Sequence, residues 1–379
     1  MSKKIISEVL LEVANAIETG NFGKKLKVGL TTLGSEHGFE NILQGAILAK
    51  NPVFDIVLIG KGHEDFESYV AKDEDEAHKI MEDLLDKGEI ASCVTMHYNF
   101  PIGVSTVGRV ITPARGREML LATTTGTSAT NRVEAMVRNT LYGIATAKSL
   151  GIENPTVGIA NVEGARQVEK ILLDLKGNGY NFEFATSQRA DGGSVMRGND
   201  LLMATPDVMV VDSLTGNLFM KVFSAFNTGG DYEASGYGYG PGVGEDYDRR
   251  ILILSRASGS PVVANALKYA YEIAKGKVNE IAKLEYEKAN NAKLGELISK
   301  LKGKKEGSNS DEVKVPEKEV VTSQISGVDI LDLEDATKVL WKHGIYAESG
   351  MGCTGPIILV NSSRKPNAKE ILKEAGYIS

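Results

Sequence analysis

The sequence predicts an α/β protein in which helices cover both faces of a mostly parallel sheet, followed by a small C-terminal α/β module. Short runs rich in Val and Ile alternate with longer helical patterns from Leu26 onward. These runs are almost continuously apolar, which is typical of parallel strands that are buried on both faces. An abrupt change to polar composition after residue 301 then separates the tail from the body.

The sequence up to residue 301 predicts an N-terminal helix followed by the main body of the protein. Residues 1–25 place apolar side chains at helical spacing, and glutamates interrupt the apolar core that a signal peptide needs, so we expect an amphipathic helix in a cytoplasmic protein. The body is predicted to span residues 26–301 and to end in a helical region from 263. Its predicted strands are 27–30, 55–60, 156–161, 207–212 and 250–255. Because ligands bind at the carboxyl ends of such strands, the loops after them are candidate site segments.

A charged linker and a separate tail follow the body. Residues 302–322 are nearly without large apolar side chains, and a flexible linker of this length spans a root-mean-square distance of about 25 Å. Residues 323–379 are predicted to form a module of their own. Its expected order is a strand or turn, a short helix, the segment GMGCTGP at 350–356, a strand and a last helix.

Composition excludes several classes of protein. The chain has 379 residues, of which 42% are hydrophobic and 25% charged, so it is not disordered as a whole. Its net charge of −7 provides no basic field for nucleic acid, and no run approaches the roughly 18 to 20 apolar residues of a membrane span. Only two cysteines are present, far apart, so we expect no disulfide framework and no cysteine zinc site. No other metal site and no cofactor is expected either.

Cys353 is the candidate nucleophile. Glycines on both sides allow backbone N–H groups to converge, and a nest formed by Gly352, Thr354 and Gly355 would stabilise a thiolate and later an acyl oxyanion. Lowering a thiol pKa of about 8.5 by about 1.5 units takes roughly 2 kcal/mol. The alternative is a small buried residue in a tight turn. Three glycines and a proline around the thiol favour the nucleophile.

Other groups near the two thiols are assigned lesser roles. Lys342 and His343, in the preceding helical segment, could favour the Cys353 thiolate. Cys93 lies in an apolar run without glycines, and we expect plain packing there. A metal pair with His97 is not expected, because residues four apart along a strand are distant neighbours.

The first candidate site segment in the body is the threonine-rich stretch 120–132. Thr124, Thr125, Gly126 and Thr127 follow an apolar run and precede a helical pattern. Hydroxyl and N–H groups at a helix N-terminus make an anion site without a metal, so these residues are predicted to bind phosphate. The alternative is an N-capped helix with solvated threonines.

The second candidate segment is 207–221. Gly216 is predicted to turn the chain after a strand, with Thr215 beside it. Asn217 presents an amide and Lys221 follows one helical turn later, so amide and ammonium could face one oxyanion. These two are the predicted catalytic residues of the body. The alternative is a helix that starts at a turn and carries an ordinary surface lysine.

The third candidate segment is the glycine-rich stretch 236–244. It lacks the strand and helix context of a dinucleotide fingerprint, which argues against nicotinamide binding. Gly240 and Gly242 are instead predicted to approach the substrate closely or to form a mobile lid. A flexible surface loop is the alternative.

Residues 154–172, 207–221 and 237–244, followed by 266–275, together resemble the motifs of the phosphate acyltransferases of phospholipid synthesis. That family resembles isocitrate and isopropylmalate dehydrogenases in fold and phosphotransacetylases in chemistry, and it makes acyl phosphate from a carrier thioester and phosphate. The resemblance covers the body. It assigns Thr215, Gly216, Asn217 and Lys221 to the family's motif, with inorganic phosphate as a substrate.

The whole chain, including GMGCTGP, resembles the alpha subunits of component C of glycine/sarcosine/betaine reductase. In that family the cysteine in this setting is acetylated, which implies an acetyl thioester on Cys353 and formation of acetyl phosphate. The resemblance also implies a component C beta subunit and the selenoprotein component A as partners, and a homo-oligomer.

One segment departs from the acyltransferase pattern. Residues 96–106 lack the family's glycine-rich element and carry Tyr98, Phe100 and Pro101, which would suit a two-carbon acyl group. Two other functions stay open. A dehydrogenase would use Asp207 and Asp212 for a metal ion, and a non-catalytic carrier would only present Cys353 to the beta subunit.

Overall fold

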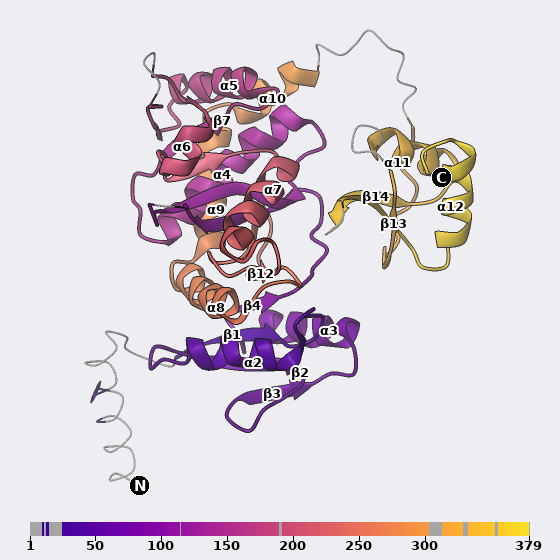
Figure 1. Cartoon of the computed structure of the whole chain (residues 1–379). Coiled ribbons are helices and arrows are strands. Elements are labelled where there is room, and N and C mark those ends of the chain that lie inside the picture. The colour runs from indigo at the N-terminus through magenta and orange to yellow at the C-terminus, as the bar shows by residue number, and fades with distance from the viewer. Residues whose placement is uncertain are drawn as a thin grey trace. The chain divides into compact units, whose positions relative to one another are not determined.

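The computed structural model describes residues 10, 13–14, 25–113, 115–188, 192–302, 313–328, 333–352 and 355–378 (Figure 1). The predicted N-terminal helix therefore lies largely outside the described residues, of which Leu10, Val13 and Ala14 are helical. The chain divides into two compact units. Unit 1 comprises Met1–His97, Ser224–Pro241 and Asp248–Lys277, and unit 2 comprises the remainder.

Unit 1 is built on parallel strands. Their order is β3 (Glu67–Val70), β2 (Phe54–Gly60), β1 (Leu26–Thr31), β4 (Ser92–Thr95) and β12 (Ile251–Ile253). The first two residues of β11 (Gly240–Val243) pair antiparallel with β12. The helices are α2 (Gly38–Ala49), α3 (Glu74–Asp86) and α8 (Ser260–Lys275). The predicted strands at 27–30, 55–60 and 250–255 are confirmed as β1, β2 and β12.

Unit 2 contains the second group of strands. Their order is β11 (its last two residues), β5 (Val104–Ile111), β6 (Glu118–Thr127), β10 (Val208–Val210), β7 (Thr156–Ala160) and β8 (Glu183–Phe184), and β9 (Val195–Met196) also pairs with β7. β5 is antiparallel to β6 and to β11, whereas β6, β10, β7, β8 and β9 pair in parallel. The mostly parallel α/β prediction is therefore confirmed, and the resemblance to isocitrate dehydrogenases stays a prediction.

Up to residue 302, the helices of unit 2 are α4 (Arg132–Ser149), α5 (Ala165–Gly177), α6 (Gly198–Met203), α7 (Ser213–Ala225), α9 (Val278–Asn291) and α10 (Leu294–Lys302). A short 3₁₀ turn, Phe226–Thr228, follows α7 and belongs to unit 1. The last two residues of α7 belong to unit 1. No helix in the described ranges combines the length and apolarity needed to cross a membrane.

The buried side chain of Asn139 on α4 connects the ends of three strands. Its amide nitrogen donates to the Val211 carbonyl at 3.0 Å, just after β10. Its oxygen accepts from Ser128 at 2.7 Å, after β6, and from Ser105 at 3.1 Å, in β5. Because Asn139 is 1% exposed, these bonds are protected from water and fix the carboxyl ends of β6 and β10 relative to each other.

The C-terminal module comprises β13 (Ser323–Ser326), α11 (Leu333–Lys342), β14 (Ala347–Gly352), β15 (Gly355–Val360) and α12 (Lys365–Glu374). Its sheet has the order β13-β15-β14 and is antiparallel, so the module is α+β rather than α/β. Both helices contribute to its own apolar core, which includes Leu340, Ile358 and Leu372. Residues 313–322 form no helix or strand, and the exact domain boundaries stay a prediction.

Candidate functional site

Asp212 begins the polar region at the carboxyl end of β10. Its carboxylate accepts the Thr215 N–H at 3.1 Å and the Thr215 hydroxyl at 2.6 Å, and Arg132 Nη2 donates to it at 2.9 Å. Burial raises the pKa of Asp212, but the hydrogen bonds from Thr215 and Arg132 outweigh burial and hold the pKa below its ordinary value. The carboxylate is therefore charged and caps the first turn of α7.

The metal pair that a dehydrogenase would need is contradicted. Asp207 precedes β10 and accepts the N–H and hydroxyl of Thr156 at 2.8 and 2.7 Å, whereas Asp212 follows the strand. The two carboxylates thus lie at opposite ends of one strand. Five residues of strand separate their backbones by about 16 Å, so they do not share a metal ion.

Gly216 does not turn the chain, contrary to the prediction. It lies in the first turn of α7, where its N–H donates to the Asp212 carbonyl at 2.9 Å. A Cβ at this position would lie 1.7 Å from the Thr123 carbonyl oxygen of β6. Glycine is needed here because α7 crosses the backbone of β6 at close range.

Asn217 and Lys221 stand four residues apart on α7, as predicted. Residues with this spacing lie on the same side of a helix. The Asn217 amide nitrogen donates to the Thr124 carbonyl at 3.2 Å, and Lys221 is exposed. The helix therefore presents an amide and an ammonium group together at the carboxyl end of β6. Their catalytic role stays a prediction.

The threonine-rich segment is not a loop, because β6 continues to Thr127. The Thr124 hydroxyl is buried and lies 2.7 Å from that of Thr106, and the Thr125 N–H donates to the Thr106 hydroxyl at 3.0 Å. Gly126 has a φ of +82° and approaches the Val104 carbonyl. These contacts hold the segment within the sheet.

Thr127 differs from the other threonines of this segment. Its buried hydroxyl has no hydrogen-bond partner among the residues that the structure describes, which suits a hydroxyl awaiting a ligand. The following helix, α4, is capped instead by Asn131, whose side chain accepts the N–H groups of Val133 and Glu134. The alternative of an N-capped helix with solvated threonines is therefore confirmed for the cap, which Asn131 provides, and wrong for Thr124, which is buried. Phosphate binding by this segment stays a prediction.

The glycine-rich segment is a buried strand over Gly240–Val243, so a surface loop or mobile lid is wrong for these residues. A Cβ on Gly242 would lie 2.3 Å from the ring of Phe100. Phe100 also packs edge-on against Tyr98 and Tyr247, with ring centroids 5.1 and 5.7 Å away. Gly242 therefore makes room for an aromatic cluster, and phosphate binding by Gly240 and Gly242 stays a prediction.

Cys353 and Thr354 lie outside the described residues. On either side of them Gly352 ends β14 and Gly355 begins β15, and these two glycines pair across the hairpin. The predicted thiolate nest is therefore untested, as is the influence of the exposed Lys342 and His343.

Cys93 is 0% exposed in β4, and burial raises the pKa of its thiol. A Cβ on Gly29 would lie 2.8 Å from the Cys93 Sγ, which is too close for van der Waals contact. The prediction of plain packing at Cys93 is confirmed.

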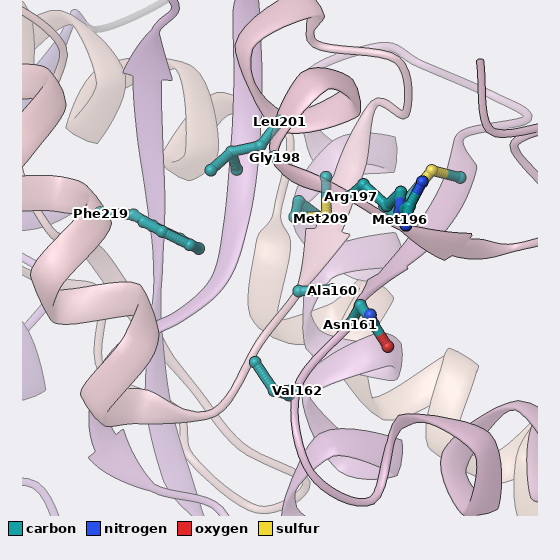
Figure 2. A pocket seen from close by; sticks show the side chains of 9 residues that line it. All are labelled: Ala160, Asn161, Val162, Met196, Arg197, Gly198, Leu201, Met209 and Phe219. Carbon is teal, nitrogen blue, oxygen red and sulfur yellow. The ribbon is translucent and has the colours of Figure 1, made fainter. Parts of the chain in front are cut away.

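A pocket of about 320 Å³, which the sequence did not reveal, lies at the carboxyl end of β7 in unit 2. Figure 2 shows Phe219 of α7 pointing into it from one side, with Ala160 and Met209 on the strands opposite. The other lining residues are Asn161, Val162, Met196, Arg197, Gly198 and Leu201. Phe219 lies about 200° around the helix from Asn217, so the pocket flanks α7 on the side away from the Asn217 amide.

The matches to known proteins identify the family of this chain. Residues 26–359 match a family described as "Fatty acid synthesis protein", and the chain belongs to that family. It is 63% identical over 381 residues to the glycine/sarcosine/betaine reductase complex component C subunit alpha of Peptoclostridium acidaminophilum, covering 100% of this chain and 99% of the relative. Within the broader family, the chain therefore belongs to the component C alpha subunits.

More distant relatives share part of the chain. The phosphate acyltransferase of Thermotoga petrophila is 25% identical over 240 residues, which cover 52% of this chain and 67% of that protein. A branched-chain phosphotransacylase from Enterococcus faecalis V583 has 15% identity and a TM-score of 0.49, covering 65% of this chain and 99% of that one.

Proposed function

We propose that this chain is the acetyl-transferring subunit of a glycine reductase complex, in which Cys353 carries an acetyl thioester and inorganic phosphate accepts the acetyl group. The observation that carries the proposal is the pair of Asn217 and Lys221 on α7. It is backed by the buried Thr127 hydroxyl, for which the described part of the chain provides no hydrogen-bond partner. The relatives support the same chemistry, since one is named for component C and others for phosphate acyltransfer.

The proposed reaction is a phosphorolysis of the thioester. A phosphate oxygen attacks the acetyl carbonyl carbon, and the carbonyl oxygen becomes an oxyanion. The C–S bond then breaks, its electron pair leaves with the Cys353 sulfur as a thiolate, and acetyl phosphate is released. Phosphate is already ionised at neutral pH, so positioning and oxyanion stabilisation matter more than a general base.

The residues of α7 supply that stabilisation. The Asn217 amide and the Lys221 ammonium group are donors for the oxyanion and the phosphate, respectively. Removing one such donor typically lowers kcat by about 100- to 1,000-fold. The beta subunit would receive the two-carbon unit from the selenoprotein component A and pass acetyl to Cys353. No resident cofactor is proposed, and inorganic phosphate is the second substrate.

The test is acetylation of the full chain by acetyl phosphate, read by mass spectrometry of the peptides. The proposal predicts a gain of one acetyl group on the peptide that contains Cys353, absent in Cys353→Ser and retained in Cys93→Ser. Acetylation that persists in Cys353→Ser would contradict it.

A second measurement separates catalysis from a mere carrier role. The acetylated chain is incubated with phosphate and without the beta subunit, and acetyl phosphate is measured. Release of acetyl phosphate that falls at least 100-fold in Lys221→Met supports catalysis on α7. Release only when the beta subunit is added would identify the chain as a carrier scaffold.

A further inference from the structure

The pocket at the carboxyl end of β7 is separate from the pair of Asn217 and Lys221, because its lining residue Phe219 lies about 200° around α7 from each of them. Its volume is about 320 Å³, and Figure 2 shows that strands, the segment after β7 and α7 all contribute to its lining. Ligands of open α/β sheets bind at the carboxyl ends of the strands, in hollows of about 300 to 1,000 Å³. The position and size of this pocket are therefore those of a site for a small ligand.

The walls of the pocket are apolar. Met196, Met209 and Leu201 are almost fully buried, and Phe219 is partly buried. A Cβ on Gly158 would lie 2.6 Å from the Met196 side chain, so the glycine leaves this methionine room beside the pocket. Because the methionine side chain is flexible and polarisable, it adapts its shape to an apolar ligand. The walls therefore suit an aliphatic chain.

Arg197 gives the pocket its charge. Of the nine described residues that line the pocket, Arg197 alone is charged. Within the part of the chain that the structure describes, no carboxylate forms an ion pair with its guanidinium group. Asn161 also lines the pocket, and its amide is a second hydrogen-bond donor. The polar part of the lining therefore selects an anion, and the planar guanidinium group suits a carboxylate.

The buried carboxylate of Asp200 fixes the segment that carries Arg197. It accepts the Arg197 N–H at 2.9 Å, the Gln188 N–H at 2.8 Å and the Ser187 hydroxyl at 2.7 Å. Burial raises the pKa of Asp200, but these hydrogen bonds outweigh burial and hold the pKa below its ordinary value. Because backbone and hydroxyl donors surround this charge, the Arg197 guanidinium group stays available to a ligand, from a fixed backbone position beside the pocket.

The volume limits the size of the ligand. A pocket of about 320 Å³ is about ten times the share of one water molecule, so the ligand has at most about ten non-hydrogen atoms. We propose that the pocket binds a small aliphatic carboxylate of about four to six carbons, with its carboxylate on Arg197 and Asn161 and its chain against Met196, Met209 and Phe219. A nucleotide exceeds this size, and a two-carbon acid leaves the apolar walls uncovered. Binding does not rest on the proposed function, because Asn217 and Lys221 take no part in it.

The first test is isothermal titration of the full chain with hexanoate, and with acetate and hexylamine as comparison ligands. Each buried methylene group strengthens binding about fourfold, so hexanoate should bind at least about tenfold more tightly than acetate. Hexylamine has the same chain and the opposite charge, and it should bind at least about tenfold more weakly than hexanoate. No binding of hexanoate at about 10 mM, or equal binding of hexylamine, overturns the proposal.

Two substitutions locate the bound hexanoate. Arg197→Gln should weaken binding by at least about tenfold because a charge-assisted hydrogen bond is lost, whereas Arg166→Gln on α5, outside the pocket, should bind like the parent. A Cβ on Gly198 meets nothing within 4 Å, so Gly198→Leu adds a side chain beside the pocket without a clash and should also weaken binding. Its control is Gly177→Leu on α5, where a Cβ likewise meets nothing within 4 Å. Unchanged binding in both pocket variants contradicts the proposal.

A third measurement observes the parent chain directly. In NMR spectra of the isotope-labelled methionine methyl groups, hexanoate should shift the Met209 resonance, which is assigned by its loss in Met209→Leu. The reference is Met81, which is buried in α3 of unit 1 and should not shift. A Met209 resonance that stays in place at saturating hexanoate refutes the site. Phosphorolysis is assayed on the same sample: hexanoate binding in a chain without this activity would refute the proposed function and leave the carboxylate site intact.

Discussion

Replacing Gly216 by alanine tests the close approach of α7 to β6. The added Cβ would lie 1.7 Å from the Thr123 carbonyl oxygen and 2.8 Å from the Val211 side chain. An ordinary carbon–oxygen contact is about 3.3 Å, so the helix must move by roughly 1.5 Å. The carbonyl belongs to a sheet backbone and cannot rotate away as a side chain would.

The magnitude follows from two opposing effects. Overpacking of this kind costs up to about 3 kcal/mol, whereas alanine gains about 1 kcal/mol over glycine in a helix. We therefore expect Gly216→Ala to lower the free energy of unfolding by about 2 kcal/mol. Asn217 moves with the helix, and a misplacement of about 1 Å costs about 100-fold in rate. The rate of phosphorolysis should therefore fall by more than the lower free energy of unfolding alone explains.

The assays are urea unfolding and acetyl phosphate release from the acetylated chain. The matched control is Gly295→Ala on α10, an exposed helical position where a Cβ meets nothing within 4 Å. It should leave the rate unchanged and stabilise the protein by up to about 1 kcal/mol. If Gly216→Ala unfolds and reacts like the parent, the close approach is not a constraint and the reasoning fails.

Three further predictions concern two buried groups, Glu285 and Cys93, and the partly buried Asp212. Burial raises the pKa of Glu285, but the hydrogen bond that it accepts from Lys148 at 2.8 Å helps to hold this pKa below its ordinary value. Glu285→Gln should therefore lower the free energy of unfolding in urea by about 2 kcal/mol at pH 7. The difference in stability between the parent and this variant should vanish as the pH falls through the folded pKa of Glu285. A difference that persists at pH 2 would contradict this. Cys93 should stay unreactive towards a thiol reagent in a Cys353→Ser chain until denaturant unfolds it, and rapid labelling of the native chain would refute its burial. Asp212→Asn should lower the thermal stability by about 1 kcal/mol, because the α7 cap loses its charge, and an unchanged melting temperature would show that the cap contributes nothing.

The parallel strands could be predicted from the sequence because each is a short apolar run bounded by polar residues. β1, β2, β7, β10 and β12 all have this form. β6 was misjudged because its hydroxyl side chains resemble a loop, although threonine is β-branched and suits a strand. β14 was missed because glycine weakens a strand pattern, and the pairing of Gly350 with Ile357 depends on residues of the next strand.

The candidate site was predictable only where its geometry is local. Asn217 and Lys221 lie on one side of α7 because of helical spacing alone. The reason for Gly216 is not local, since the Thr123 carbonyl that excludes a Cβ belongs to another strand. The pocket beside Phe219 likewise combines residues from three strands and two helices, and no short motif signals it.

Gly216 and Lys221 are assigned different roles on α7, so substitutions should separate them. Gly216 packs against the backbone of β6, whereas Lys221 is exposed. A change at Gly216 acts on packing, and a change at Lys221 acts on the reaction. Lys221→Met should therefore slow phosphorolysis by about 100-fold and leave urea unfolding unchanged, whereas Gly216→Ala should alter both. A loss of stability in Lys221→Met as large as in Gly216→Ala would instead mean that the lysine supports the fold rather than the reaction.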